Sequence, residues 1–281
     1  MPLIRLAVTP SEAGTRDALS AALFGAGCLG LHEDGEALVT VVTSSAEDAV
    51  LLDALVRAVR VADGAARVEL SELPDVDWSQ EWRTRIGAHE VGTLAIVPPW
   101  LAEGRNALRT VVIEPQMAFG TGEHQTTRCM VRLMQGVIRA GDTVADLGAG
   151  SAVLSIAAAK LGAARVAAIE MDADAIPNAE LNVARNGVAG QVTLLLGSAA
   201  LMLPLVAPVR VVLANIISSV LVELLPPIAD AVPAGGAAIL SGILVTEREV
   251  MLEIIATDGH WRVDAEEVEG DWWAVRLERT G

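Results

Sequence analysis

Residues 144–151 read Val-Ala-Asp-Leu-Gly-Ala-Gly-Ser. They follow the pattern of a buried strand, predicted over 143–147, that turns directly into a helix, predicted over 151–161. Gly148 and Gly150 would let the backbone approach a ligand closely, and the N-terminus of the following helix offers unpaired N–H groups. This strand, Gly-x-Gly turn and helix indicate the ligand-binding edge of a parallel sheet.

Two features near the glycine turn distinguish between possible ligands. Asp146 directly precedes the turn, where a carboxylate would repel a pyrophosphate but could meet a cationic or hydroxyl-bearing group. Position 153 is Val, so the third glycine of the dinucleotide fingerprint G-x-G-x-x-G is missing. Glu170 ends the next predicted strand and could accept hydrogen bonds from both hydroxyls of a ribose. NAD and S-adenosylmethionine both carry such a ribose, and the incomplete fingerprint favours S-adenosylmethionine.

Strand and helix patterns alternate on both sides of this turn, which predicts an α/β fold with a doubly wound, mostly parallel, seven-stranded methyltransferase sheet. A closing antiparallel hairpin is predicted over 261–268 and 272–278. The other expected strands are 165–170, 192–196, 209–214 and 237–241, and the expected helices are 124–139, 173–186, 246–258 and one that begins at 218.

The residues before this region divide into two parts. Residues 1–72 show the order β-α-β-β-α-β of a small ferredoxin-like α+β domain, with strands at 3–8, 28–32, 37–43 and 66–70 and helices at 11–25 and 45–62. We expect this domain to recognise the substrate. Residues 73–110 are interpreted as a connecting region, and 111–281 as the cofactor-binding domain. Trp78, Trp82 and Trp100 in the connecting region are expected to pack the domains together, or one of them to line a substrate groove.

Composition excludes several classes of function. The formal net charge of −16 argues against direct nucleic-acid binding, which relies on clustered Lys and Arg. It suits a basic protein partner, or it simply keeps an apolar chain soluble. No apolar run reaches the roughly 18–20 residues of a membrane-spanning helix, and no secretory signal precedes Pro10, so a soluble cytoplasmic enzyme is expected. Cys28 and Cys129 lack neighbouring ligands, so no metal site is expected.

A second motif lies ahead of the glycine turn. Residues 114–127 read Glu-Pro-Gln-Met-Ala-Phe-Gly-Thr-Gly-Glu-His-Gln-Thr-Thr, and two threonines are expected to cap the following helix. Together with residues 146–150, Glu170 and the strand end at 214–216, this stretch closely resembles the ribosomal protein L11 methyltransferases (PrmA). The resemblance covers nearly the whole chain, and AFGTG-x-H-x-TT is far more specific than the glycine turn.

The resemblance implies a protein N-methyltransferase that acts as a monomer. It would move methyl groups from S-adenosylmethionine to lysine ε-amines and the N-terminal α-amine of a basic large-subunit ribosomal protein. Asn215 and Thr121 are expected to orient the acceptor nitrogen, and His124 to hold the helix start rather than to act as a base. The remaining residues expected to bind or cover the cofactor are Phe119, Gly122, Thr127, Asp146, Gly148, Gly150 and Glu170, and Asn215 is expected to contact it as well.

The chain departs from the family pattern at a few positions. Ala152 stands where the family usually has a glycine, and its methyl group is expected to lie near the cofactor and to weaken binding. Ser198 stands where related methyltransferases often carry an Asp for the adenine amine. Two alternatives remain: a protein-lysine or small-molecule methyltransferase with another substrate, and a non-catalytic or NAD-binding relative. Asn215 and the loop 119–127 disfavour the second alternative.

Overall fold

The computed structural model describes residues 3–28, 30–43, 46–73, 86–115 and 122–281. Contacts divide the chain into two units, Met1–Arg85 and Ile86–Gly281. None of the helices in these described ranges is long and apolar enough to cross a membrane.

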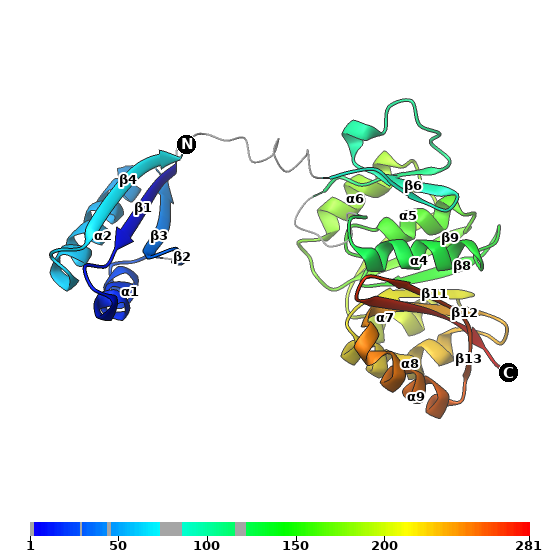
Figure 1. Cartoon of the computed structure of the whole chain (residues 1–281). Helices are drawn as coiled ribbons and strands as arrows, with labels where there is room; N and C mark the ends of the chain where they lie inside the picture. The colour runs from blue at the N-terminus through cyan, green and yellow to red at the C-terminus, as the bar shows by residue number, and fades with distance from the viewer. Residues whose placement is uncertain (1–2, 29, 44–45, 74–85, 116–121) are drawn as a thin grey trace. The chain divides into compact units, whose positions relative to one another are not determined.

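The N-terminal unit has the predicted β-α-β-β-α-β order (Figure 1). Its antiparallel sheet runs β2-β3-β1-β4, and Leu6, Leu19 and Leu55 from the sheet and both helices share one core. Its elements are β1 (Leu3–Thr9), α1 (Arg16–Gly25), β2 (His32–Asp34), β3 (Ala37–Thr43), α2 (Ala46–Ala62) and β4 (Arg67–Leu73).

Strand β2 begins later than the predicted 28–32. The backbone N–H of Cys28 donates to the carbonyl of Leu23 at 3.0 Å, and Gly27 adopts a φ of 103°. These are the features of a glycine-terminated helix end. Cys28 therefore completes the end of α1 instead of starting the strand.

The C-terminal unit contains, in the described part of the chain, the predicted seven-stranded sheet, in the order β10-β9-β8-β11-β12-β14-β13. The first five strands are parallel, β14 pairs antiparallel with β12, and β13 pairs antiparallel with β14. The strands are β8 (Thr143–Leu147), β9 (Arg165–Glu170), β10 (Val192–Leu196), β11 (Val211–Asn215), β12 (Ala237–Leu244), β13 (Trp261–Glu269) and β14 (Trp272–Arg279).

Helices cover both faces of this sheet, as a doubly wound fold requires (Figure 1). One face carries α4 (Gln125–Gln135), α5 (Val153–Lys160) and α6 (Ile176–Arg185). The other carries α7 (Ala199–Val206), α8 (Ser218–Ala231) and α9 (Arg248–Asp258). Helix α7 was not predicted from the sequence. It is short and contains Pro204, and a proline inside a helix removes a backbone hydrogen bond.

A further small sheet also belongs to the C-terminal unit. It consists of β5 (His89–Val91), β6 (Leu94–Val97) and β7 (Thr110–Val112), and its apolar side chains enter the same core as α4 and α5. All of these strands except the end of β7 lie within the connecting region predicted over 73–110. Trp100 lies half-buried in a 3-10 turn after β6, whereas Trp78 and Trp82 fall outside the described residues.

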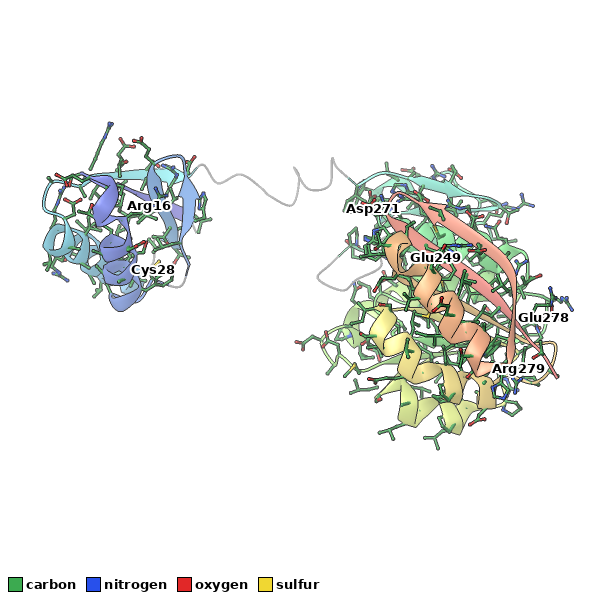
Figure 2. All side chains as sticks on the ribbon, turned by 60° about the horizontal axis from the view of Figure 1, so that its bottom comes forward. Arg16, Cys28, Glu249, Asp271, Glu278 and Arg279 are labelled. Atoms are coloured by element: carbon green, nitrogen blue, oxygen red, sulfur yellow. The ribbon has the colours of Figure 1, made fainter. Side chains whose placement is uncertain are left out.

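The C-terminal hairpin is tied to α4. Arg128 donates to Glu269 at 2.8 Å through Nε, and Arg132 donates to Glu267 at 3.0 Å. Asp271 lies at the turn of this hairpin, and Glu278 and Arg279 lie at its other end (Figure 2). These contacts join α4 to the end of β13, next to the hairpin turn.

Candidate active site

Three polar residues end neighbouring parallel strands on the same face of the sheet. Along β11, Val211 and Leu213 pack toward α4–α6, while Val212 and Ala214 pack toward α7–α9. Because side chains alternate along a strand, Asn215 must emerge on the α4–α6 side. The same alternation along β8 and β9 places Asp146 and Glu170 on that side. The carboxyl ends of such strands are where open α/β sheets bind their ligands.

Glu170 is held by three backbone N–H groups. Its Oε2 accepts from Gly150 at 2.8 Å, and its Oε1 accepts from Met171 at 2.8 Å and from Asp172 at 2.9 Å. The side chain links the end of β9 to the glycine turn after β8. A carboxylate has about four lone-pair sites, so one remains available to a ligand.

Asp146 is 1% exposed and lies under the glycine turn. Its Oδ2 accepts from the Ser155 hydroxyl at 2.6 Å, and its Oδ1 has no hydrogen-bond partner among the described residues. Burial raises the pKa of Asp146 to about 6, with the charge on Glu170 acting in the same direction and the Ser155 bond opposing it. A buried carboxyl group with an unsatisfied oxygen is suited to a cationic ligand.

Two glycines enclose Ile216 at the end of β11. A Cβ on Gly148 would lie 2.7 Å from Ile216 Cγ2, and one on Gly242 would lie 2.4 Å from the Ile216 carbonyl oxygen. Both glycines have positive φ, 72° and 85°. Gly242 sits where the β12–β14 register shifts between Leu240 and Ile243, which is the signature of a bulge. The backbone after Asn215 passes against Gly242, where any side chain would meet it, and the Ile216 side chain packs against Gly148.

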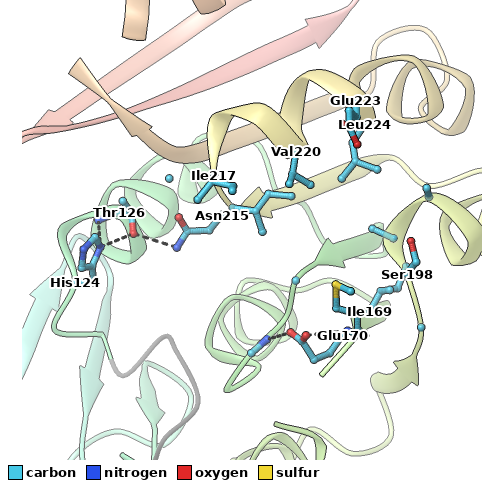
Figure 3. Close-up of a pocket in the computed structure, with 18 of the residues that line it drawn as sticks. His124, Thr126, Ile169, Glu170, Ser198, Asn215, Ile217, Val220, Glu223 and Leu224 are labelled. Carbon is cyan, nitrogen blue, oxygen red and sulfur yellow. Dashed lines mark hydrogen bonds between the residues drawn. The ribbon is translucent and has the colours of Figure 1, made fainter. Parts of the chain in front are cut away.

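These elements surround a pocket of about 700 Å³, within the range of small-molecule and cofactor sites (Figure 3). Of the residues predicted for the site, Gly148, Gly150, Glu170 and Asn215 line it. Asp146 and Thr127 are almost fully buried and are not among the lining residues.

The loop before α4 is partly described. Phe119 and Thr121 fall outside the described residues. Gly122 has a φ of 90°, and a Cβ there would lie 2.5 Å from Ile96 Cγ2, so a larger residue would push the loop away from β6. Arg128 Nη1 donates to the Glu123 carbonyl at 2.6 Å, and the Glu123 carboxylate accepts from the Gly87 N–H at 3.0 Å and lies 2.8 Å from His89 Nε2. The end of this loop is therefore fixed to the small sheet and to α4.

The lining residues that were not predicted include His124, Thr126 and Trp272. His124 is the N-cap of α4 and accepts from the Thr126 backbone N–H, so the expected helix-holding role is confirmed. The expectation that the two threonines cap this helix was wrong, because both lie inside its first turn. Trp272 comes from the start of β14, far away in sequence, and its ring meets that of His124 edge-on at 4.9 Å.

Asn215 is connected to this group. Its Nδ2 donates to Thr126 Oγ1 at 3.1 Å, and that hydroxyl lies 2.7 Å from His124 Nδ1 (Figure 3). The Oδ1 of Asn215 is buried without a hydrogen-bond partner among the described residues. Burial, followed by the charge of Arg128, lowers the pKa of His124, which favours its neutral form.

Ala152 does not point into the pocket. It is the N-cap of α5 with a φ of 65°, it is fully buried, and its side chain belongs to the core between the sheet and α4–α6. A non-glycine residue in the left-handed region costs about 1 kcal/mol. The departure from glycine therefore places a backbone strain beneath the glycine turn, rather than a methyl group against a ligand.

Comparison with known proteins identifies the family. The sequence profile of ribosomal protein L11 methyltransferase (PrmA) matches residues 29–280. This chain belongs to the PrmA family. The ribosomal protein L11 methyltransferases of Bacillus cytotoxicus and Bacillus anthracis are each 34% identical to it over 215 residues, which are 75% of this chain and 68% of the relative.

Solved structures agree with this assignment. The ribosomal protein L11 methylase of Lactobacillus delbrueckii subsp. bulgaricus has a TM-score of 0.61 and 28% identity, covering 69% of this chain and 99% of that one. The M. jannaschii tRNA m1G37 methyltransferase, at 15% identity and a TM-score of 0.51 over 98% of this chain, shares the fold alone. As a PrmA member, the chain is an S-adenosylmethionine-dependent protein methyltransferase. The described residues contain no group of three His, Cys, Asp or Glu residues able to hold a metal.

Proposed function

We propose that this enzyme methylates the lysine ε-amines and the N-terminal α-amine of ribosomal protein L11. The observation that carries the proposal is the PrmA match over residues 29–280, because it spans the pocket-forming unit and most of the N-terminal unit. The net charge of −16 supports a basic protein substrate, since opposite charges favour encounter. A ribosomal substrate also places the enzyme in the cytoplasm, and we propose that it acts there as a monomer.

The pocket has groups suited to each part of S-adenosylmethionine, which supplies a methyl group activated on a sulfonium. We assign the ribose to Glu170, whose carboxylate is oriented by three backbone donors and keeps one acceptor site for a ribose hydroxyl. The unpartnered Oδ1 of Asp146 suits the cationic amino group, reached through the glycine turn of Gly148 and Gly150. The pocket is also lined by the exposed Met171 and by Ser198, which directly precedes α7. We assign the adenine to this part of the pocket, next to the ribose.

The protein must also make the acceptor amine reactive. A lysine amine in water has a pKa of about 10.4 and is protonated at neutral pH. Ile216, Ile217 and Val220 form an apolar wall of the pocket, and desolvation there lowers the pKa of an entering amine. We propose that Asn215 orients the nitrogen of this amine. Thr121, Phe119, Gly122 and Thr127 remain proposed members of the site from the family pattern.

Labelling of ribosomal proteins tests the proposed substrate. The purified enzyme is incubated with tritiated S-adenosylmethionine and ribosomal proteins from a strain that lacks this enzyme. We expect label on L11 alone, with mass spectrometry placing the methyl groups on lysine side chains and the N-terminus. Label on a different protein, or on a small molecule in the extract, would instead establish another substrate for the same fold.

A further inference from the structure

We propose that His124 and Thr126 are positioning residues that set the orientation of the Asn215 amide, so that its Oδ1 faces the pocket and accepts an N–H of the acceptor amine. The proposal rests on the methyl transfer argued above and adds two residues to it. Its basis is a chain of hydrogen bonds that starts at the N-cap of α4 and ends at the carboxyl end of β11.

The direction of this chain follows from its first member. His124 Nδ1 accepts from the Thr126 backbone N–H at 3.4 Å, as the N-cap of α4. A proton on Nδ1 would point at that N–H, so the neutral ring must carry its proton on Nε2. Burial and the nearby Arg128 charge keep the ring neutral by lowering the pKa of His124. Trp272 packs edge-on against the ring at 4.9 Å and holds its plane.

The second step is the hydroxyl of Thr126. Since Nδ1 can only accept, the O–H of Thr126 donates to it over 2.7 Å. The lone pairs of Oγ1 are then available to a donor, and Asn215 Nδ2 lies 3.1 Å away. An Asn side chain with the opposite flip would place its carbonyl oxygen against the Thr126 oxygen, with no proton between them. The relay therefore permits one orientation of the amide.

The third step is the consequence for the pocket. With Nδ2 engaged, Oδ1 is directed away from Thr126 and is buried without a partner among the described residues, although Asn215 lines the pocket. A buried carbonyl oxygen without a partner costs about 1–3 kcal/mol. A neutral amine has an N–H to donate while its lone pair stays free. Asn215 can thus hold the nitrogen without competing for the electrons that form the new bond.

Substitution of Thr126 tests the relay in the full-length enzyme. Thr126→Val keeps the shape and leaves the backbone cap of α4 in place, but it removes the hydroxyl. We expect the single-turnover rate to fall about tenfold, because a positioned group near the reacting centre is lost. Calorimetric affinity for S-adenosylhomocysteine should stay within about threefold. Thr126→Ser restores the hydroxyl and should recover the rate.

A matched control separates positioning from stability. Thr110 is also buried and donates its hydroxyl at 2.9 Å, to the Asn106 carbonyl, but it lies in β7 outside the pocket lining. Thr110→Val should lower the melting temperature by a similar amount and leave the rate unchanged. Equal rate losses in both variants would show that Thr126 acts through stability alone and would overturn the proposal.

A spectroscopic readout does not depend on the substrate. Nitrogen-15 NMR of the cofactor-free wild type should show His124 with Nδ1 unprotonated and Nε2 protonated. In Thr126→Val the side-chain amide signals of Asn215 should shift or broaden as its orientation is released. A protonated Nδ1, or unchanged Asn215 signals, would overturn the relay. A wild type with these signals but no activity on L11 would instead contradict the proposed substrate.

Discussion

At the scale of single residues, Glu170 combines a proposed role in ligand binding with hydrogen bonds that shape its own loop. Glu170→Ala removes the acceptor proposed for the ribose, and hydrogen bonds to charged groups contribute about 1.5–3 kcal/mol. Calorimetry should show the affinity for S-adenosylmethionine reduced about ten- to a hundredfold. The variant also leaves the Gly150 N–H without its acceptor, so a moderate loss of thermal stability should accompany it.

Glu180 provides the control for this experiment because it lies exposed on α6 and carries the same charge. Glu180→Ala should bind the cofactor as the wild type does. Unchanged binding by Glu170→Ala would remove Glu170 from the cofactor site.

Asp146 makes a separate prediction about pH. Its pKa is raised from 3.8 to about 6 in the folded protein, so between these values the folded state holds a proton that the unfolded state has lost. The contribution of this group to stability is complete below pH 3.8 and is lost as pH rises through 6. At neutral pH the buried charge costs about 3 kcal/mol. Asp146→Asn should therefore raise the melting temperature of the cofactor-free protein at pH 8.

The same substitution should weaken the binding of S-adenosylmethionine. In the wild type, affinity for S-adenosylmethionine should fall as pH drops below about 6, because the protonated Asp146 no longer attracts the cationic amino group. Asp146→Asn should bind weakly at every pH and remove this dependence. A wild-type affinity that stays flat from pH 8 to pH 5 would show that Asp146 is structural only.

At the scale of elements, the strands of the seven-stranded sheet were predictable from sequence, whereas α7 and the small sheet β5–β7 were not. Strands β8, β9 and β10 lie at the predicted residues because each is a short apolar run with clear turn signals at its ends. Helix α7 and strands β5–β7 were not predicted because they are short. Their apolar side chains are buried against residues that lie far away in the sequence. The strand-end residues Glu170 and Asn215 were likewise visible in sequence.

The pocket wall shows the same division. Thr126 reaches Asn215 across 89 residues of sequence, and Trp272 reaches His124 across a still longer separation. Nothing in the local pattern around Thr126 distinguishes it from Thr127, the residue favoured by the family motif. Only the direction in which α4 presents its first turn decides which hydroxyl meets the strand end.

In the N-terminal unit, Asp63 directly follows α2 and links the end of that helix to the segment before α1. Its carboxylate accepts from the Ser11 backbone N–H at 2.9 Å and from the hydroxyls of Ser11 and Thr15. The Ser11 bonds lower the pKa of Asp63 to about 2, so its stabilisation is present above pH 3.8 and is lost as pH falls through 2. Asp63→Asn should speed hydrogen exchange in α1 and β4 at pH 7.

The difference between Asp63→Asn and the wild type should shrink as pH falls through 2, below which both side chains are neutral. Asp53→Asn is the matched control, since Asp53 forms an exposed pair with Arg57 on the same helix. An effect of equal size in both variants would show that Asp63 acts through a general effect of charge on α2 and not through its hydrogen bonds to Ser11 and Thr15.

At the scale of the whole molecule, the division at residue 86 predicts separable tasks. All of the described pocket residues belong to Ile86–Gly281. A chain that begins at Ile86 should bind S-adenosylmethionine within about threefold of the full-length affinity but should no longer methylate L11. Circular dichroism and a cooperative melting transition must first show that the shortened chain is folded. Full-rate methylation of L11 by that chain would give residues 1–85 a different purpose.

The position of Trp272 also bears on the order in which this enzyme is made. Trp272 follows His124 by 148 residues, yet it forms part of the pocket wall and its ring packs against that of His124. During translation the N-terminal domain can fold as soon as it emerges. The pocket cannot be completed until the hairpin of β13 and β14 has been synthesised and has left the ribosome. A nascent chain that does not yet include this hairpin therefore lacks one wall of the pocket.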